Sequence, residues 1–370
     1  MPPKRPDGVG ALPITVEPPA PPPADPAVLY AALDLGTNSC RMLIAQPKGN
    51  QFHVVDSFSK SVQLGQGLES SGRLSRSAMA RTVQALRICE RKIRKHNVRR
   101  MRLVATEACR RATNAGEFLG YVKQETGLAL EIIPTEEEAR LAVISCAPLV
   151  STRTEQLLVV DIGGGSTELV WIDLTRVPWV ERPRAIMRLR TGFTPDESPF
   201  PAARVVDWIS VPLGVATLRE QVRDVRDDAA QFALMSWFFE ENLASFTPYA
   251  AEQSREGFQI IGTSGTVTTV AASHLGLRRY DRGKVDGLRM TSDQIDLVIR
   301  NYLALGPEGR RTDPRIGRDR HTLIMSGAAI LQALLRLWPT DRLSVADRGL
   351  REGLLYSQMS ADGVLEDGPY

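Results

Sequence analysis

The sequence predicts an α/β protein built from two related lobes. Apolar, strand-like runs alternate along the chain with segments of helical spacing, as is typical of the α/β class. A strand, an aspartate, a glycine-containing turn and a second strand occur at 28–46, and the same unit recurs at 157–172. At 370 residues the chain is also long enough for two domains, each with its own core. We therefore expect each lobe to present one of these hairpins to a shared site.

The hairpin at 159–171 reads VVDIGGGSTELVW and points to phosphate binding. Asp161 ends an apolar strand, and Glu168 adds a second carboxylate where the next strand begins. Glycines have no side chain to keep a ligand away and reach positive φ, so their amides can close on phosphate oxygens. The expected phosphate ligands are Gly163, Gly164, Gly165, Ser166 and Thr167. The alternative is a glycine-rich hairpin without a ligand, because a short motif needs structural context.

Two further turns supply that context. The hairpin at 28–46 has Asp34 at the end of its first strand. Its candidate phosphate ligands are Gly36, Thr37, Asn38 and Ser39. In FQIIGTSGTVTTVAA, at 258–272, a strand leads through a glycine turn into a helix, whose N-terminal amides attract anions. The candidate ligands of this third turn are Ser264, Gly265 and Thr266.

Five strings of the chain together resemble the exopolyphosphatase/guanosine pentaphosphate phosphatase (Ppx/GppA) family. They are ALDLGTNS, DIGGGSTE, TEEEAR at 135–140, GTSGT at 262–266 and GLREG at 349–353. The resemblance covers roughly residues 28–357. It implies the two-lobed, ribonuclease H-like fold of actin, sugar kinases and Hsp70, in the short form of the family that lacks an additional C-terminal domain.

The resemblance also implies a catalytic glutamate and a phosphate-binding arginine. Glu138 matches the family's catalytic base, with Glu168 as a second catalytic candidate, and Arg110 in TEACR matches the arginine. Composition alone favours another role for Glu138, because Thr135 and Glu138 have the spacing of a capping box at the start of a helix. The chain departs from the family at Pro134-Thr135, where Ser-Gly is usual.

Hydrolysis of a phosphoanhydride requires charge neutralisation, an oriented water and a group that accepts its proton. Mg²⁺, or Mn²⁺ in its place, prefers one or two carboxylates together with water and substrate oxygens. Asp161 is the strongest candidate for a metal ligand, and Asp34 and Glu168 complete the expected arrangement. We therefore expect a metal-dependent phosphatase.

The domain boundaries follow from composition and spacing. A proline-rich tail at 1–27 is expected to be disordered, followed by a first lobe at 28–148 and a second at 149–345. By the resemblance, a last helix near 346–357 packs back on the first lobe. Other helices are expected at 74–96, 114–126, 135–147, 215–225, 228–245, 292–305 and 321–338, and strands at 101–105 and 128–133.

A long connection at 173–206 is rich in arginine. Its arginines are Arg176, Arg182, Arg184, Arg188 and Arg190. Arginine binds phosphate with a planar fork of donors, so this segment is a candidate track for a polyanion. We favour the alternative of a solvated loop.

Composition limits the classes of partner and compartment. The formal net charge of +3 gives no sign of a nucleic-acid partner, and a polyanionic substrate would tolerate it. The four cysteines have no paired spacing, which fits a reducing cytoplasm. No apolar run approaches the length of a membrane helix, and the N-terminus has no apolar signal core. We expect a cytoplasmic protein without a membrane partner, and a homodimer is a further expectation.

Three classes of function compete at this stage. The first is an exopolyphosphatase that removes terminal phosphate from inorganic polyphosphate, with hydrolysis of guanosine pentaphosphate to tetraphosphate as its close alternative. The second is a sugar-kinase-like phosphotransferase, which would need an adenosine pocket and a hydroxyl acceptor site that the sequence does not locate. The third is a non-catalytic regulator that binds a nucleotide or alarmone. The retained Glu138, Asp161 and Glu168 argue against this class.

Overall fold

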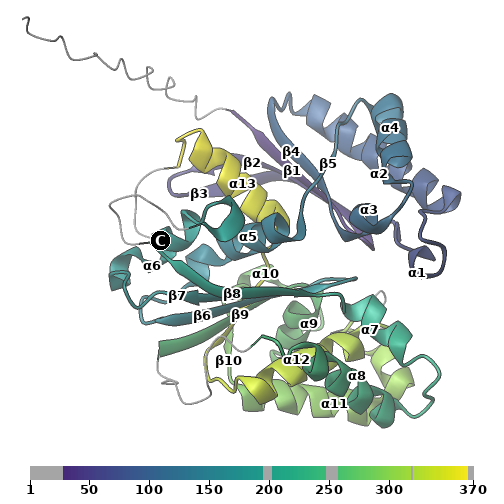
Figure 1. The fold of residues 1–370 in the computed structure, drawn as a ribbon, viewed down its shortest axis with the longest axis vertical. Coiled ribbons are helices and arrows are strands. Elements are labelled where there is room, and N and C mark those ends of the chain that lie inside the picture. The colour runs from purple at the N-terminus through teal and green to yellow at the C-terminus, as the bar shows by residue number, and fades with distance from the viewer. Residues whose placement is uncertain (1–27, 195–201, 247–256, 318–319, 366–370) are drawn as a thin grey trace, which may run out of the picture.

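The computed structural model describes residues 28–194, 202–246, 257–317 and 320–365. Within these residues the strands form two sheets, of five and six strands, with helices on both sides of each sheet (Figure 1). The α/β class and the two-lobed fold are therefore confirmed. The tail predicted at 1–27 lies outside the described residues, as does 195–201 of the arginine-rich segment.

The first sheet has the strand order β3-β2-β1-β4-β5. Its strands are β1 (Tyr30–Leu35), β2 (Ser39–Lys48), β3 (Gln51–Ser61), β4 (Arg100–Ala105) and β5 (Glu131–Ile132). The helices of this lobe are α1 (Leu68–Ser71), α2 (Arg76–Lys95), α3 (Glu107–Arg111) and α4 (Ala115–Thr126). Buried residues of α2 and α4, among them Leu86 and Phe118, pack against Leu33 on the outer face of the sheet.

The second sheet has the strand order β10-β11-β9-β6-β7-β8. Its strands are β6 (Gln156–Ile162), β7 (Thr167–Asp173), β8 (Arg204–Val211), β9 (Phe258–Thr263), β10 (Arg289–Met290) and β11 (Leu343–Ala346). The helices are α6 (Arg182–Met187), α7 (Val215–Gln221), α8 (Asp228–Asn242), α9 (Gly265–His274), α10 (Arg282–Val285), α11 (Ser292–Thr312) and α12 (Ile324–Leu337). The largest buried cluster of the protein lies between this sheet and α8, α9, α11 and α12.

The two sheets repeat the same topology. The series β3-β2-β1-β4-β5 and β8-β7-β6-β9-β11 match in order and in strand direction, antiparallel over the first three strands and parallel over the rest. The hairpins also match in detail: the amide of Gly36 donates to the Ser39 carbonyl at 3.0 Å, and the amide of Gly163 donates to the Ser166 carbonyl at 2.9 Å. The duplicated hairpin predicted from the sequence is thus a repeat of whole lobes.

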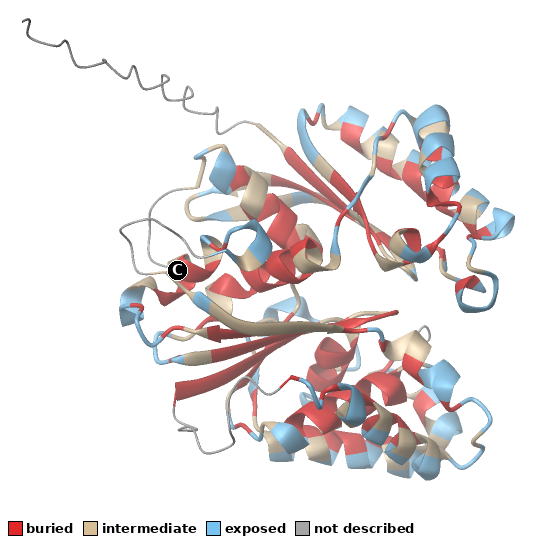
Figure 2. Ribbon diagram, viewed as in Figure 1, coloured by how far each residue is buried: buried red, intermediate tan, exposed pale blue. Residues whose placement is uncertain are grey.

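Two helices, α5 (Thr135–Cys146) and α13 (Leu350–Ala361), lie between the sheets (Figure 1). Ala139 and Val143 of α5 pack on the second sheet, whereas Leu141 packs with α13 on the first. The helices cross so closely that a Cβ on Gly353 would lie 2.0 Å from the Leu141 carbonyl oxygen. Figure 2 shows both helices mostly buried, so they connect the lobes through a packed interface.

The short strands β10 and β11 were not predicted, and nor were the two long strands β3 and β8. Both lie at sheet edges, where one face of the strand stays in contact with solvent. β3 accordingly alternates between exposed and half-buried residues, and β8 is half-buried over most of its length. Neither forms the continuous apolar run that identifies a buried strand. Among the described helices, none is both long and apolar enough to cross a lipid bilayer.

Candidate active site

The turns of the two hairpins meet between the lobes. A Cβ placed on Gly165 would lie 3.4 Å from Oγ1 of Thr37 and 3.2 Å from Cγ of Glu107. A Cβ on Gly164 would lie 4.0 Å from the Cβ atoms of Thr37 and Asn38. Glycine at position 165 therefore lets the two turns approach each other more closely than a residue with a side chain would. Gly36, Ser39 and Gly163 close the two turns through the hydrogen bonds described above.

Neighbouring loops hold the carbonyl groups of both turns. The carbonyl of Asn38 accepts from the amides of Val62 and Gln63, at 2.9 Å each. In the second turn, the carbonyl of Gly163 accepts from Val215 at 3.0 Å and that of Gly164 from Ala216 at 2.9 Å. Four backbone amides of the turns remain unpaired. They are those of Thr37, Asn38, Gly164 and Gly165, which have no acceptor among the described residues. Unpaired amides in facing turns are suited to binding phosphate oxygens.

Glu138 is held at the entrance of α5 by Arg110 of α3. Nη1 of Arg110 donates to Oε2 of Glu138 at 2.7 Å and to the Ile133 carbonyl at 3.0 Å, and Nη2 donates to Glu107 at 3.1 Å. The capping box expected here is absent, since α5 begins at Thr135 with Pro134 as its cap residue and without a side-chain cap. Glu138 instead bonds Arg110 and lies near the carboxyl group of Glu168.

Four carboxyl groups gather beneath the turns: Asp34, Glu138, Asp161 and Glu168. Burial raises the pKa of each one. The neighbouring charge of Glu168 raises the pKa of Glu138 further, against the opposing effect of Arg110. Burial, with the charges of Glu138 and Asp34, raises the pKa of Asp161 to about 7. Like charges in one buried space repel each other, so the site favours a cation or a proton.

Glu168 is fixed by two serines. Ser166 and Ser210 both donate from Oγ to its Oε1, at 2.6 and 2.8 Å. The Ser166 hydroxyl thus orients a carboxylate. The expectation that Thr167 offers its hydroxyl to phosphate is wrong, because that side chain is fully buried and donates to the Leu213 carbonyl at 2.8 Å. Successive strand residues point to opposite faces, which separates Thr167 from Glu168.

The third turn places Ser264 and Gly265 near the cleft. Ser264 has φ 115°, an uncommon backbone conformation for a residue other than glycine, and it caps α9 by accepting from the Thr266 amide at 3.3 Å. Arg320 donates to the Gly265 carbonyl at 3.0 Å. The expected phosphate contact of the Thr266 side chain is not supported, because it packs against α12 so tightly that a Cβ on Gly327 would lie 2.1 Å from its Oγ1.

Three arginines near Asp34 were not predicted from the sequence. Burial and the charges of Arg351 and Arg320 lower the pKa of Arg41, while Asp34 and Asp161 raise it, so these groups share one environment. The Arg41 guanidinium has no hydrogen-bond or ion-pair partner among the described residues. Its position offers a signal in the sequence: Arg41 pairs with Asp34 across the first hairpin as Glu168 pairs with Asp161 across the second. Arg110 acts on Glu138 and Glu168, and Arg41 acts on Asp161 and Asp34, so we describe the four carboxyl groups as a row. Arg110 lies at one end of this row, and a cationic cluster of Arg41, Arg320 and Arg351 lies at the other.

The carboxylates proposed as metal ligands suit Mg²⁺ only in part. Within the described residues no three His, Cys, Asp or Glu side chains form a ready-made metal site. Mg²⁺ does not need one, because it binds through one or two carboxylates and takes its other ligands from water and substrate. The mutual repulsion of Asp161 and its neighbours favours a cation there, so these residues fit a metal that enters with its phosphate substrate.

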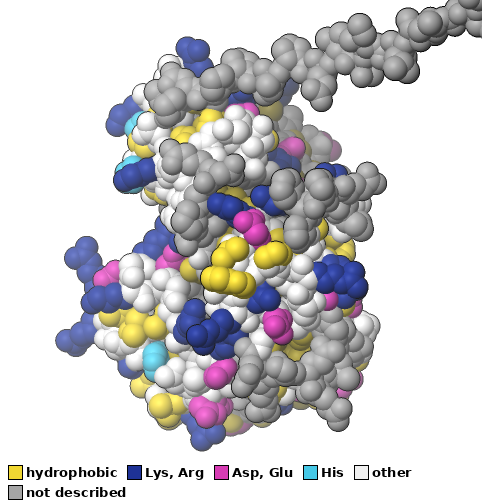
Figure 3. All heavy atoms as spheres, turned by 90° about the vertical axis from the view of Figure 1, so that its left-hand side faces the viewer, with side chains coloured by type: hydrophobic (Ala, Val, Ile, Leu, Met, Phe, Trp, Pro, Cys, Tyr) yellow, Lys and Arg dark blue, Asp and Glu magenta, His cyan; other side chains and the backbone are white. Residues whose placement is uncertain are grey.

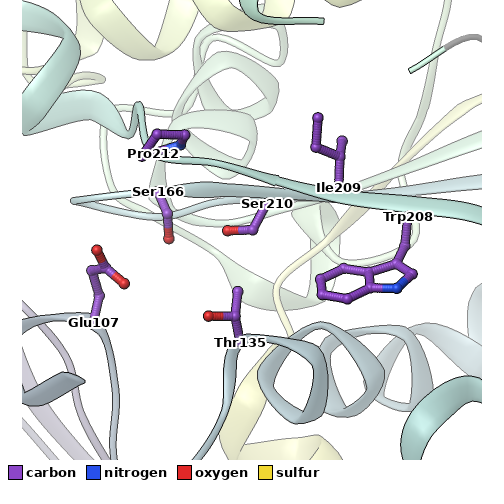
Figure 4. Close-up of a pocket in the computed structure, with 7 residues that line it drawn as sticks. All are labelled: Glu107, Thr135, Ser166, Trp208, Ile209, Ser210 and Pro212. Carbon is purple, nitrogen blue, oxygen red and sulfur yellow. The ribbon is translucent and has the colours of Figure 1, made fainter. Parts of the chain in front are cut away.

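An open pocket of about 500 Å³ adjoins Glu168 and the start of α5 (Figure 4). Its polar lining is Glu107, Thr135, Ser166 and Ser210, and its apolar lining is Trp208, Ile209 and Pro212. In Figure 4 the side chains of Trp208 and Ser210 lie on the Thr135 side of β8. These two residues belong to an edge strand that was not predicted from the sequence.

The arginine-rich segment reaches the pocket through Phe193, which packs on Trp208, whereas Arg182 and Arg184 make structural contacts. It contains α6 in place of the expected loop, with Arg182 buried against the Thr152 carbonyl at 2.7 Å and Arg184 paired with Glu181 at 3.0 Å. On the face shown in Figure 3, the visible Lys and Arg side chains are interspersed with acidic ones. Arg182 and Arg184 are therefore structural in this fold.

Facing amide turns, with a glutamate held at their side by an arginine, place the protein among two-lobed phosphatases. The chain belongs to the Ppx/GppA phosphatase family, whose model matches residues 43–362.

Solved structures support this assignment. The crystal structure of the Aquifex aeolicus family member is 30% identical, with a TM-score of 0.72, and the match covers 90% of this chain and 98% of that one. An exopolyphosphatase-like protein is 27% identical, with a TM-score of 0.73, over 89% of this chain and 97% of that one. An exopolyphosphatase from Cytophaga hutchinsonii is similar in fold, with 21% identity and a TM-score of 0.74. The match covers 91% of this chain and 100% of that one.

Proposed function

We propose that the protein hydrolyses the terminal phosphoanhydride of inorganic polyphosphate and releases orthophosphate. The observation that carries this proposal is the position of Glu138, which is hydrogen-bonded to Arg110 and lies beside two facing turns with unpaired amides. A phosphoryl group between the turns would meet amides on both sides and a carboxylate at one end. Such preorganised donors stabilise the charge that develops on a transferring phosphoryl group.

Each group has a defined part in the reaction. The amides of Thr37, Gly164 and Gly165 hold the terminal phosphoryl oxygens. Glu138 accepts a proton from the attacking water while the new O–P bond forms and the bridging P–O bond breaks. Arg110 orients the Glu138 carboxylate and opposes the rise in its pKa that burial and Glu168 cause.

The remaining chain leaves on the opposite side of the phosphorus, because the displacement is in line. The cationic cluster of Arg41, Arg320 and Arg351 lies at that end of the carboxyl row and would hold a polyanion. Asp161, with Asp34 or Glu168, would hold Mg²⁺ or Mn²⁺, which when bound neutralises charge on the phosphoryl oxygens.

Guanosine pentaphosphate is the second candidate substrate, because its terminal phosphoanhydride makes the same demands on the turns and on Glu138. A regulator that only binds a nucleotide or alarmone would need no proton acceptor, and a glutamate oriented by an arginine favours turnover.

The test is release of orthophosphate from long polyphosphate, guanosine pentaphosphate and ATP in parallel, with Mg²⁺ and with EDTA. We expect release from polyphosphate that EDTA stops. Release from guanosine pentaphosphate alone would move the assignment to that substrate. Tight binding of either compound without release of phosphate would indicate a regulator.

A further inference from the structure

The open pocket of about 500 Å³ lies beside the start of α5, which in the proposed reaction is the side from which water attacks. Thr135, one helical turn before Glu138, forms part of its wall. Ser166 and Ser210, which both donate to Glu168, form another part. The cationic cluster that would hold the leaving chain lies at the other end of the carboxyl row. Whatever occupies the pocket therefore approaches the phosphoryl group from the side of Glu138.

The lining of the pocket is unsuited to a polyanion. It contains no lysine or arginine among the described residues, and its one charged side chain is the carboxylate of Glu107. The hydroxyls of Ser166 and Ser210 donate to Glu168 and can still accept from a neutral polar molecule, and the Thr135 hydroxyl lies in the same lining. A phosphate chain would gain little there, because the lining supplies no cation and the charge of Glu107 is paired with Arg110.

Trp208 gives the pocket an aromatic wall. It pairs with Val170 across β7 and β8, two positions before Ser210, so both side chains project from the same face of the strand. One side of the indole is anchored against Phe193, with ring centroids 5.8 Å apart. The indole also borders the pocket (Figure 4). An indole packs well against the C–H face of a sugar or polyol, which carries hydroxyls around its edge.

The volume is far larger than a single attacking water needs, since one water occupies about 30 Å³ of liquid. We propose that this pocket binds a small neutral polyol or sugar, and that the protein transfers the terminal phosphoryl group of its donor to a hydroxyl of that acceptor in competition with water. This inference rests on the proposed phosphoanhydride hydrolysis, because it uses the same donor and the same base.

The transfer step balances without a further reagent. The acceptor oxygen forms a bond to phosphorus while the bridging P–O bond of the donor breaks. The proton of the acceptor hydroxyl passes to Glu138, and the shortened polyphosphate leaves with the bonding electrons. The products are a phosphate monoester and a polyphosphate one unit shorter, in place of orthophosphate and the same shortened chain.

The experiment incubates the full chain with long polyphosphate and Mg²⁺ in the presence of glycerol, glucose or methanol, and measures ester and orthophosphate by ³¹P NMR. We expect a glycerol or glucose ester that saturates with acceptor concentration. Relative to methanol at equal hydroxyl concentration, the ester-to-orthophosphate ratio should be at least about 10-fold higher, because a bound hydroxyl has a raised effective concentration. Parallel reactions with guanosine pentaphosphate and ATP as donors cover the alternative substrates.

Variants connect the result to the pocket. Trp208→Ala should lower the ester-to-orthophosphate ratio about 3- to 10-fold, and Trp208→Phe, which keeps an aromatic face, should restore most of it. Trp237 is half exposed on α8, outside the pocket, so Trp237→Ala is the matched control and should leave the ratio unchanged.

The outcomes separate the two proposals. Orthophosphate release with no ester above the methanol ratio would overturn the acceptor site and leave the hydrolase standing. A ratio that Trp208→Ala leaves unchanged would also overturn it. Neither product from any of the three donors would overturn both proposals.

Discussion

Arg110 and Glu138 are joined by a hydrogen bond of 2.7 Å, although they belong to different helices and are 28 residues apart in sequence. The same guanidinium also bonds the Ile133 carbonyl and Glu107, so three acceptors fix its orientation. Burial and the charge of Glu168 raise the pKa of Glu138, and Arg110 opposes both effects. The arginine therefore orients a buried carboxyl group and limits the rise in its pKa, which still stays above its ordinary value.

Replacement of Arg110 tests this relationship. Arg110→Gln should lower kcat/KM for polyphosphate by roughly 10²-fold, since a preorganised electrostatic group is lost. Its neighbour provides the control, because Arg111 pairs chiefly with Glu69 at 2.5 Å and reaches Glu107 only at 3.7 Å. Arg111→Gln should leave turnover within about 2-fold, as expected for an exposed pair of small energetic value. Equal losses in both variants would contradict a specific role for Arg110.

The cationic cluster should act on substrate binding. Arg320→Gln and Arg351→Gln should each raise KM for long polyphosphate more than they lower kcat, and the effect should shrink as salt screens the charges. Arg184, which pairs with Glu181 on α6, is the matched arginine outside the cleft. Steady-state kinetics measure these effects. If Arg184→Gln raises KM as much as the cluster variants do, the arginine-rich segment is the substrate track instead.

The crossing of α5 and α13 should depend on Gly353. Gly353→Ala places a methyl group 2.0 Å from the Leu141 carbonyl, so the helices must separate. We expect a loss of at least about 2 kcal/mol in the free energy of unfolding. Gly120, inside α4, has open space around it, and Gly120→Ala should instead stabilise the protein by about 0.5–1 kcal/mol through helix propensity. Denaturant unfolding compares both variants, and a neutral Gly353→Ala would refute the close crossing.

Glu137 should contribute to stability and not to turnover. It is buried between Arg140 and Arg102, with hydrogen bonds of 2.7 and 3.0 Å. Burial raises the pKa of Glu137, but the two arginines outweigh that effect and hold it below its ordinary value. Glu137→Gln should cost roughly 3 kcal/mol near neutral pH, as for a broken buried pair.

The pH dependence follows from the lowered pKa. A carboxyl with a lower pKa in the folded state stabilises the protein above the unfolded pKa of about 4.3, and this contribution is lost as pH falls further. The stability difference between wild type and Glu137→Gln should therefore be constant above about pH 5 and shrink below it. Glu136→Gln, in the same helical turn, is the control. A difference that persists in acid would exclude the ion pair as its cause.

The sequence predicts much of the fold because the central strands are continuous apolar runs. Leu157 to Val160 and Phe258 to Ile261 lie between layers of helices, and their burial is visible in their composition. The edge strands β3 and β8 carry no such signal, and β8 also begins within the arginine-rich segment. Trp208 and Ser210 were not predicted as site residues because β8 itself was not predicted.

The geometry of the candidate site was predictable where it rests on adjacent residues. The glycine turns are defined by adjacent residues, and their facing arrangement follows from the repeat. The alternation of side chains along a strand is also sufficient to separate Thr167 from Ser166 and Glu168. The contact of Arg110 with Glu138 joins distant segments, and composition alone favoured a helix cap for Glu138. The tertiary structure excludes the helix cap, and the catalytic role of Glu138 stays a prediction.

The most direct test of the whole account is turnover by Glu138→Gln, which keeps the shape of the side chain and removes its charge. We predict a folded protein that still binds polyphosphate, with kcat for orthophosphate release reduced by roughly 10²-fold or more. Binding should persist because the amide turns and the cationic cluster are unchanged. Near-normal kcat in this variant would contradict the account and transfer the role of base to another acid, with Glu168 the first to test.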